Sequence, residues 1–102
     1  MGGNCKIVLC AGLLSVLSSA ANAQEDWRAF MLSASCAACH GTDGRSPDSI
    51  PTIQGKSAGY IANRLNAYKS GEGNPTVMNR LAKGYSAEEI DLISAWFAAQ
   101  SR

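Results

Sequence analysis

The sequence predicts an all-α domain. Three stretches of the chain carry apolar residues at the three- and four-residue spacing of one helix face. No stretch alternates apolar and polar residues as a half-buried strand would. Glycines and prolines gather between the three stretches, where they mark loops. We therefore expect three main helices joined by ordered loops.

The N-terminal segment, residues 1–23, has the pattern of a cleaved secretory signal peptide. Lys6 supplies a positive charge, an apolar run follows over 7–17, and Ala21 and Ala23 provide the small residues of an A-x-A cleavage site. We therefore expect export to the periplasm and a mature domain formed by residues 24–102. The apolar run is too short for a comfortable transmembrane helix, so we expect no stable membrane insertion after cleavage. The alternative is an uncleaved N-terminal anchor.

The expected mature domain is small and electrically neutral. Cleavage after Ala23 leaves 79 of the 102 residues, with eight basic and eight acidic side chains. This neutral balance gives no support for a nucleic-acid partner. Domains of roughly 70–80 residues usually need a disulfide, a metal or another cross-link. A disulfide between Cys36 and Cys39 would close a very small loop and remove little entropy from the unfolded chain, so we expect a different cross-link there.

The first helix is expected over residues 26–38. Acidic Glu25 and Asp26 stand where the positive end of a helix dipole favours them. The expected core-facing stripe of this helix consists of Trp27, Phe30, Met31 and Ala34. Residues 41–55, which are rich in glycine and proline, follow as an ordered loop.

The second helix is expected over 57–70, with Ser57 as its N-cap and Gly71 as its stop signal. Its apolar stripe consists of Tyr60, Ile61, Leu65 and Tyr68. A mostly irregular segment comes next, with one helical turn after Pro75.

The third helix begins with a capping box, Ser86-Ala87-Glu88-Glu89, and continues to about Gln100. Its apolar face consists of Ile90, Ile93, Trp96 and Phe97.

Two cysteines and the chain's only histidine lie within five positions, as Cys36, Cys39 and His40. At the end of a helix, residues spaced i, i+3 and i+4 share one face, so the two thiols and the imidazole can meet one flat group. C-x-x-C-H is the attachment pattern of c-type haem, in which both thiols form thioethers and the histidine binds iron. We therefore predict one covalently bound haem c, held by Cys36 and Cys39, with His40 as an axial ligand.

Three other interpretations of this motif stay open. A thioredoxin-like redox pair requires a βαβ context that the sequence does not predict. A zinc site requires a second Cys/His pair, which the mature chain lacks. The third is a chance pattern in which His40 is simply exposed.

Met78 is the expected second axial ligand of the iron. The mature chain has two methionines, and Met31, in the same helix as the cysteines, is expected to pack in the core. Met78 follows His40 by 38 positions, which is enough chain to reach the opposite face of the haem. Histidine–methionine ligation gives a raised reduction potential and favours electron transfer. The alternative is a packed Met78 and an open iron site.

Several residues around this site have two interpretations. The carbonyl of Pro51 is expected to accept a hydrogen bond from the ring of His40, although this proline could simply stiffen its loop. The aromatic residues of the second and third helices could line the haem or pack between helices. The cations Arg64, Arg80 and Lys83 could reach a haem propionate or could be solvated surface charges.

Taken with these motifs, the chain resembles a single-haem class I cytochrome c over essentially the whole mature domain. The resemblance rests on "CAACHG", the proline-containing "SIPTIQG", the helix "YIANRLNAYKSGE" and a methionine loop before the last helix. It implies the small all-α cytochrome c fold, with three main helices around one haem whose edge is exposed.

The segment from Met78 to Ile90 resembles a narrower group, the cytochrome subunit of flavocytochrome c sulfide dehydrogenase. Its pattern is M-x-R-(L/I)-A-K-G-Y-S-x-E-E-I. The resemblance implies a periplasmic flavoprotein (FAD) partner that oxidises sulfide and passes electrons to this chain, which is not an enzyme on its own. It names no downstream acceptor. The alternatives are a free diffusible electron shuttle and a haem sensor or small catalyst with an open iron site.

Overall fold

The computed structural model describes the backbone of residues 4–100 and the side chains of residues 19–100. The described chain is all-α and contains no strand, as predicted. Its elements are α1 (Asn4–His40), the short 3-10 turn η1 (Thr42–Gly44), α2 (Ala58–Lys69), α3 (Met78–Ala82) and α4 (Ala87–Ala99). Residues 1–3 of the expected signal segment and 101–102 lie outside the described part.

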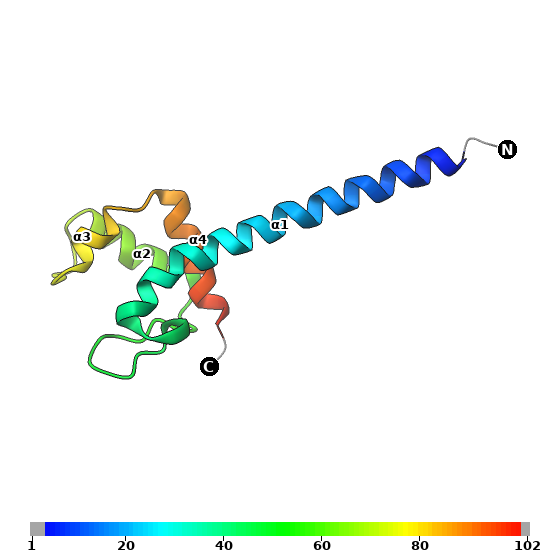
Figure 1. The fold of residues 1–102 in the computed structure, drawn as a ribbon. Coiled ribbons are helices and arrows are strands. Elements are labelled where there is room, and N and C mark those ends of the chain that lie inside the picture. Colours follow the sequence, from blue (N-terminus) through cyan, green and yellow to red (C-terminus); the bar gives the residue numbers. More distant parts are fainter. Residues whose placement is uncertain (1–3, 101–102) are drawn as a thin grey trace.

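Helix α1 is much longer than expected. It runs from Asn4 to His40 as one helix of 37 residues, and its N-terminal part projects from the compact body (Figure 1). The expected start at Asp26 was wrong because the preceding segment is rich in alanine and leucine, which are the strongest helix formers. Among the described residues, no helix has both the length and the apolar character to cross a membrane.

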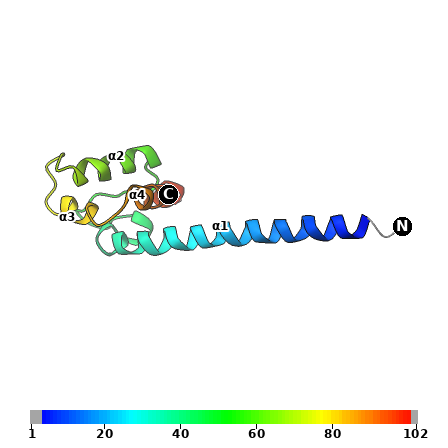
Figure 2. The same cartoon turned by 90° about the horizontal axis from the view of Figure 1, so that it is seen from above.

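Helix α4 lies between α1 and α2 and contacts both of them (Figure 2). Ile90, Ile93 and Phe97 are buried as predicted. Trp96 is partly buried at the edge of the same cluster. The predicted N-cap is present, since the Ser86 hydroxyl accepts a hydrogen bond from the Glu89 N–H at 3.2 Å. Helix α4 is therefore the central element of the core.

The buried face of α1 is not the predicted one. Trp27, Phe30 and Met31 are 61%, 42% and 53% exposed, so the prediction that Met31 packs in the core was wrong. Two of the residues on the opposite face are buried and two are partly buried: Ala29 and Ser33, then Leu32 and Cys36. The observed face follows the predicted one by two positions. Two residues turn a helix by roughly 200°, so the prediction chose nearly the opposite side.

The large aromatic residues of α1 contact one another and a tryptophan of α4. The rings of Trp27 and Phe30 are 5.5 Å apart, and Phe30 meets Trp96 edge to face at 5.5 Å. Arg28 forms an ion pair with Glu88 of α4 at 2.8 Å. Phe30 and Arg28 therefore contact α4 although both side chains remain exposed.

The loop after α1 is pinned to the C-terminal end of α4. The N–H groups of Ile53 and Gln54 donate to the Gly44 carbonyl at 2.9 and 3.1 Å, and the Gly55 N–H donates to the Phe97 carbonyl at 3.0 Å. Gly44 has a φ of 82°, and a Cβ there would lie 2.7 Å from a Phe97 ring carbon. Only glycine fits this position without displacing the Phe97 side chain. The loop can therefore pass close to the end of α4.

Helix α2 begins as predicted, because the Ser57 hydroxyl accepts a hydrogen bond from the Tyr60 N–H at 3.1 Å. Ile61 is buried against Ile93 and Phe97, Leu65 packs beside them, and Tyr60 is exposed. The helical turn expected after Pro75 is α3, which contacts α2 and begins at Met78.

Candidate haem-binding site

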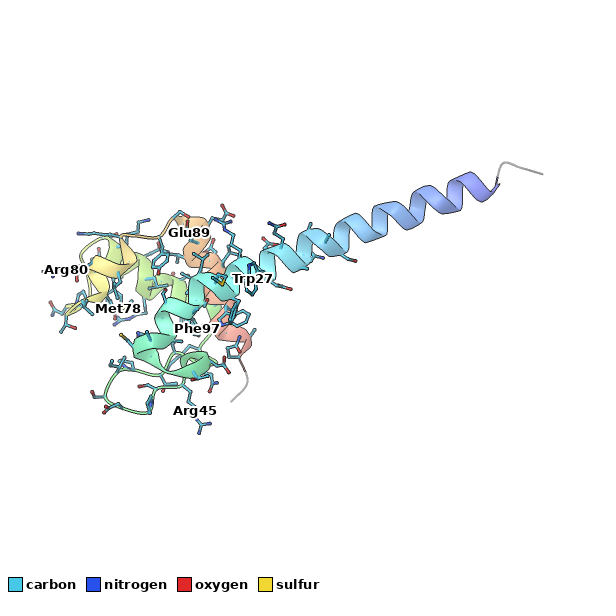
Figure 3. All side chains as sticks on the ribbon, viewed as in Figure 1. Trp27, Arg45, Met78, Arg80, Glu89 and Phe97 are labelled. Atoms are coloured by element: carbon cyan, nitrogen blue, oxygen red, sulfur yellow. The ribbon has the colours of Figure 1, made fainter. Side chains whose placement is uncertain are left out.

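One cavity of about 230 Å³ collects residues from every helix of the body and from the loop after α1. Figure 3 labels Met78 on the α3 side of this body. The walls are mostly apolar. The cavity is lined by Cys36, His40, Pro51, Thr52, Ile53, Lys56, Tyr60, Ile61, Arg64, Leu65, Tyr68, Met78 and Ile93.

Four of the five residues singled out for the haem line this cavity: Cys36, His40, Pro51 and Met78. The fifth, Cys39, is exposed and is not among the lining residues. No disulfide joins these two cysteines. They stand one helical turn apart at the end of α1, so they share the face that carries His40. The fold thus brings Met78 to the cysteine–histidine motif across 38 positions of chain.

The loop fixes the orientation of the His40 ring. His40 Nδ1 lies 2.6 Å from the carbonyl oxygen of Pro51. A carbonyl oxygen only accepts, so Nδ1 is the donor in this hydrogen bond, and Nε2 is the ring nitrogen left to bind a metal through its lone pair. A hydrogen bond at one ring nitrogen is the usual way to orient the other toward a metal.

The Cys36 thiol is partly buried in the wall of the cavity. Burial raises the pKa of this thiol above its ordinary value, and a hydrogen bond from Ser35 opposes the shift in part. The group is therefore a neutral thiol at neutral pH, which suits an apolar wall.

The site fits a covalently attached haem. The cavity combines apolar walls, one thiol, an imidazole with an oriented Nε2 and a thioether, and a second thiol stands beside it. Among the described residues no cluster of three or more His, Cys, Asp or Glu side chains could hold a metal ion. The zinc alternative therefore has no further ligands in that part of the chain.

The structure also separates residues that the sequence left undecided. Tyr60 and Tyr68 line the cavity, whereas Trp96 and Phe97 do not. Of the three cations considered, Arg64 lines it, and Arg80 and Lys83 do not. Sequence reasoning missed Lys56, Thr52 and Ile53, which reach the cavity only because the loop is pinned to α4. No local pattern in the sequence marks Lys56, whereas Thr52 and Ile53 belong to the proline-containing segment "SIPTIQG" on which the resemblance rests.

Comparisons with known proteins agree with this geometry. The family model for cytochrome c matches residues 28–99. The chain is 52% identical over 75 residues to the cytochrome subunit of sulfide dehydrogenase of Chlorobaculum tepidum, covering 74% of this chain and 68% of that protein. It is 41% identical over 69 residues to cytochrome c-554(548) of Halomonas halodenitrificans, covering 64% of this chain and 83% of the relative.

A longer relative is the thiosulfate dehydrogenase electron acceptor of Stutzerimonas stutzeri. It is 32% identical over 96 residues, which cover 89% of this chain and 44% of the relative. The family match spans most of the chain and includes the whole cavity. The chain therefore belongs to the cytochrome c family, whose members carry covalently bound haem c and transfer electrons.

Proposed function

We propose that the chain is the cytochrome subunit of a periplasmic sulfide dehydrogenase and receives electrons from an FAD-containing flavoprotein partner. The observation that carries this proposal is the 52% identity to the cytochrome subunit of sulfide dehydrogenase from Chlorobaculum tepidum. The chain is not an enzyme on its own: it has an electron-transfer role, and the oxidation of sulfide belongs to the partner.

In this proposal Cys36 and Cys39 would attach the haem through thioether bonds, and His40 and Met78 would hold its iron. The Pro51 carbonyl accepts the hydrogen bond of His40 Nδ1, which would leave Nε2 as the ring atom available to the iron. Once bound, haem c supplies a one-electron Fe(III)/Fe(II) couple. The thioether of Met78 would favour the reduced form of the iron and would exclude external ligands.

The proposal includes export. Residues 1–23 act as a signal peptide cleaved after Ala23, and the mature domain, 24–102, works in the periplasm. Haem c is attached outside the cytoplasm, so a signal segment before a C-x-x-C-H motif is consistent with this route. Intact mass spectrometry of protein isolated from the periplasm tests the cleavage: the mass should match residues 24–102 plus one haem.

The partner is tested by purification from the native periplasm followed by absorption spectroscopy. We expect flavin and haem c to co-purify, and addition of sulfide to reduce the haem rapidly. The control is this chain produced alone with its haem, because sulfide can also reduce a haem directly. Equal reduction rates with and without the flavoprotein fraction would contradict the proposal and favour the free electron shuttle.

A further inference from the structure

The charges around the cavity are of one sign. Two lining residues are cations, Lys56 and Arg64, and none of the lining residues is a carboxylate. The domain as a whole is neutral, with eight acidic side chains elsewhere. The cavity lining therefore carries a net positive charge, although the expected mature domain is neutral.

Arg64 is the more firmly held of the two cations. Its guanidinium carbon lies 4.9 Å from the centre of the Tyr68 ring, and Nη2 donates a hydrogen bond to the Tyr68 hydroxyl at 2.5 Å. Arg64 and Tyr68 are one helical turn apart on α2, and both line the cavity. Among the described residues no carboxylate forms an ion pair with Arg64, whereas Arg28 pairs with Glu88. The guanidinium is thus positioned by an aromatic ring and retains donors for an anion.

Haem carries two propionate side chains that end in carboxylates. A guanidinium matches a carboxylate through two parallel N–H donors, and this geometry is stronger and more specific than a lysine contact. We infer that Arg64, held in place by Tyr68, binds a haem propionate and raises the reduction potential of the haem. This inference rests on the haem attachment proposed above and is independent of the flavoprotein partner.

The direction of the effect follows from charge. A propionate carboxylate near the iron favours the oxidised, more positive state, and a cation paired with it cancels that preference. Loss of the guanidinium charge therefore lowers the reduction potential. Lys56, whose Nζ lies 5.5 Å from the Tyr60 ring centre, leaves part of the positive field in place.

The test compares Arg64→Gln, Arg64→Lys and Arg80→Gln in the mature, haem-loaded protein. Arg80→Gln removes the same charge from a side chain that does not line the cavity; Figure 3 shows Arg80 at the outer edge of α3. A pyridine haemochrome assay first establishes that each variant carries haem. Midpoint potentials are then measured by spectroelectrochemistry, and the propionate bending band is followed by resonance Raman.

We expect Arg64→Gln to lower the midpoint potential and shift the Raman band. Arg64→Lys should lower the potential less, because it keeps the charge and loses the two-donor geometry, and Arg80→Gln should leave both measurements unchanged. An unaltered potential or band in Arg64→Gln overturns the inference, as does an equal drop in all three variants. If Arg64→Gln fails to retain haem, an unaltered potential and band in Arg64→Lys overturn it instead. A parent protein without haem would contradict the proposed site itself, so the two failures are distinguishable.

Discussion

The two faces of α1 differ in burial, and the face with the larger apolar residues is the exposed one. One face carries the bulky residues Trp27, Phe30 and Met31 and is exposed, and the other carries Ala29 and Ser33 and is buried against the body. In α4 the bulky residues Ile90, Ile93 and Phe97 are the buried ones. The difference shows that a stripe of large apolar residues does not by itself identify the buried face of a helix. In α1 the buried face also includes the partly buried Leu32 and Cys36, which pack against the core cluster.

Of the substitutions in α1, removal of both cysteines should have the largest effect on folding. In Cys36→Ala/Cys39→Ala the haem loses its covalent anchor, and the small core between α1, α2 and α4 loses its main cross-link. We expect an unfolded or degraded chain, measured by far-UV circular dichroism and by yield from the periplasm. A folded, haem-free domain with native helix content would show that the core is sufficient without haem.

The two methionines, Met31 and Met78, allow a matched comparison between the exposed face and the cavity. Met78→Ala should keep the haem attached, lower the reduction potential and allow carbon monoxide to bind the reduced protein, because the thioether no longer fills the sixth position. Spectroelectrochemistry and carbon monoxide difference spectra provide the measurement. Met31→Ala, which removes the same group from the exposed face, is the control. An unchanged potential in Met78→Ala would exclude Met78 as the axial ligand.

Enlarging Ser33 tests the packing of the buried face of α1. Ser33 is 2% exposed, so Ser33→Leu should lower the free energy of unfolding by about 1–3 kcal/mol through overpacking. The Ser33 hydroxyl is buried and has no hydrogen-bond partner among the described residues. Ser33→Ala should therefore leave stability unchanged or raise it. Denaturant unfolding measures the free energy of unfolding of both variants. An unchanged value for Ser33→Leu would mean that the packing around Ser33 can accommodate a larger side chain.

The smallest effect is expected on the exposed face. Met31 is 53% exposed, so Met31→Ala should change the free energy of unfolding by no more than about 0.5 kcal/mol. The same denaturant measurement decides this. A loss as large as that of a buried methionine, about 2–5 kcal/mol, would mean that this face of α1 is covered in the native protein.

The site was more predictable than the packing of α1. The C-x-x-C-H motif is local, because its chemistry depends on five consecutive residues at the end of a helix. The partner role of Pro51 could be expected because a metal-binding histidine usually needs an oriented ring, and the carbonyl of Pro51 lies 2.6 Å from His40 Nδ1. Met78 was predicted as an axial ligand by elimination among two methionines, and its side chain lines the cavity. The assignment of ligands to iron stays a proposal.

The sequence by itself determined the helical class, the caps at Ser57 and Ser86 and the identity of the cofactor motif, because each depends on residues within a few positions of one another. The tertiary structure alone decided which face of α1 is buried, since that depends on which residues of α1 meet the rest of the core. It also decided that Arg64, and neither Arg80 nor Lys83, reaches the cavity. From the sequence, all three cations are equally plausible partners of a haem propionate. Only the packing of α2 and α3 around the cavity distinguishes them.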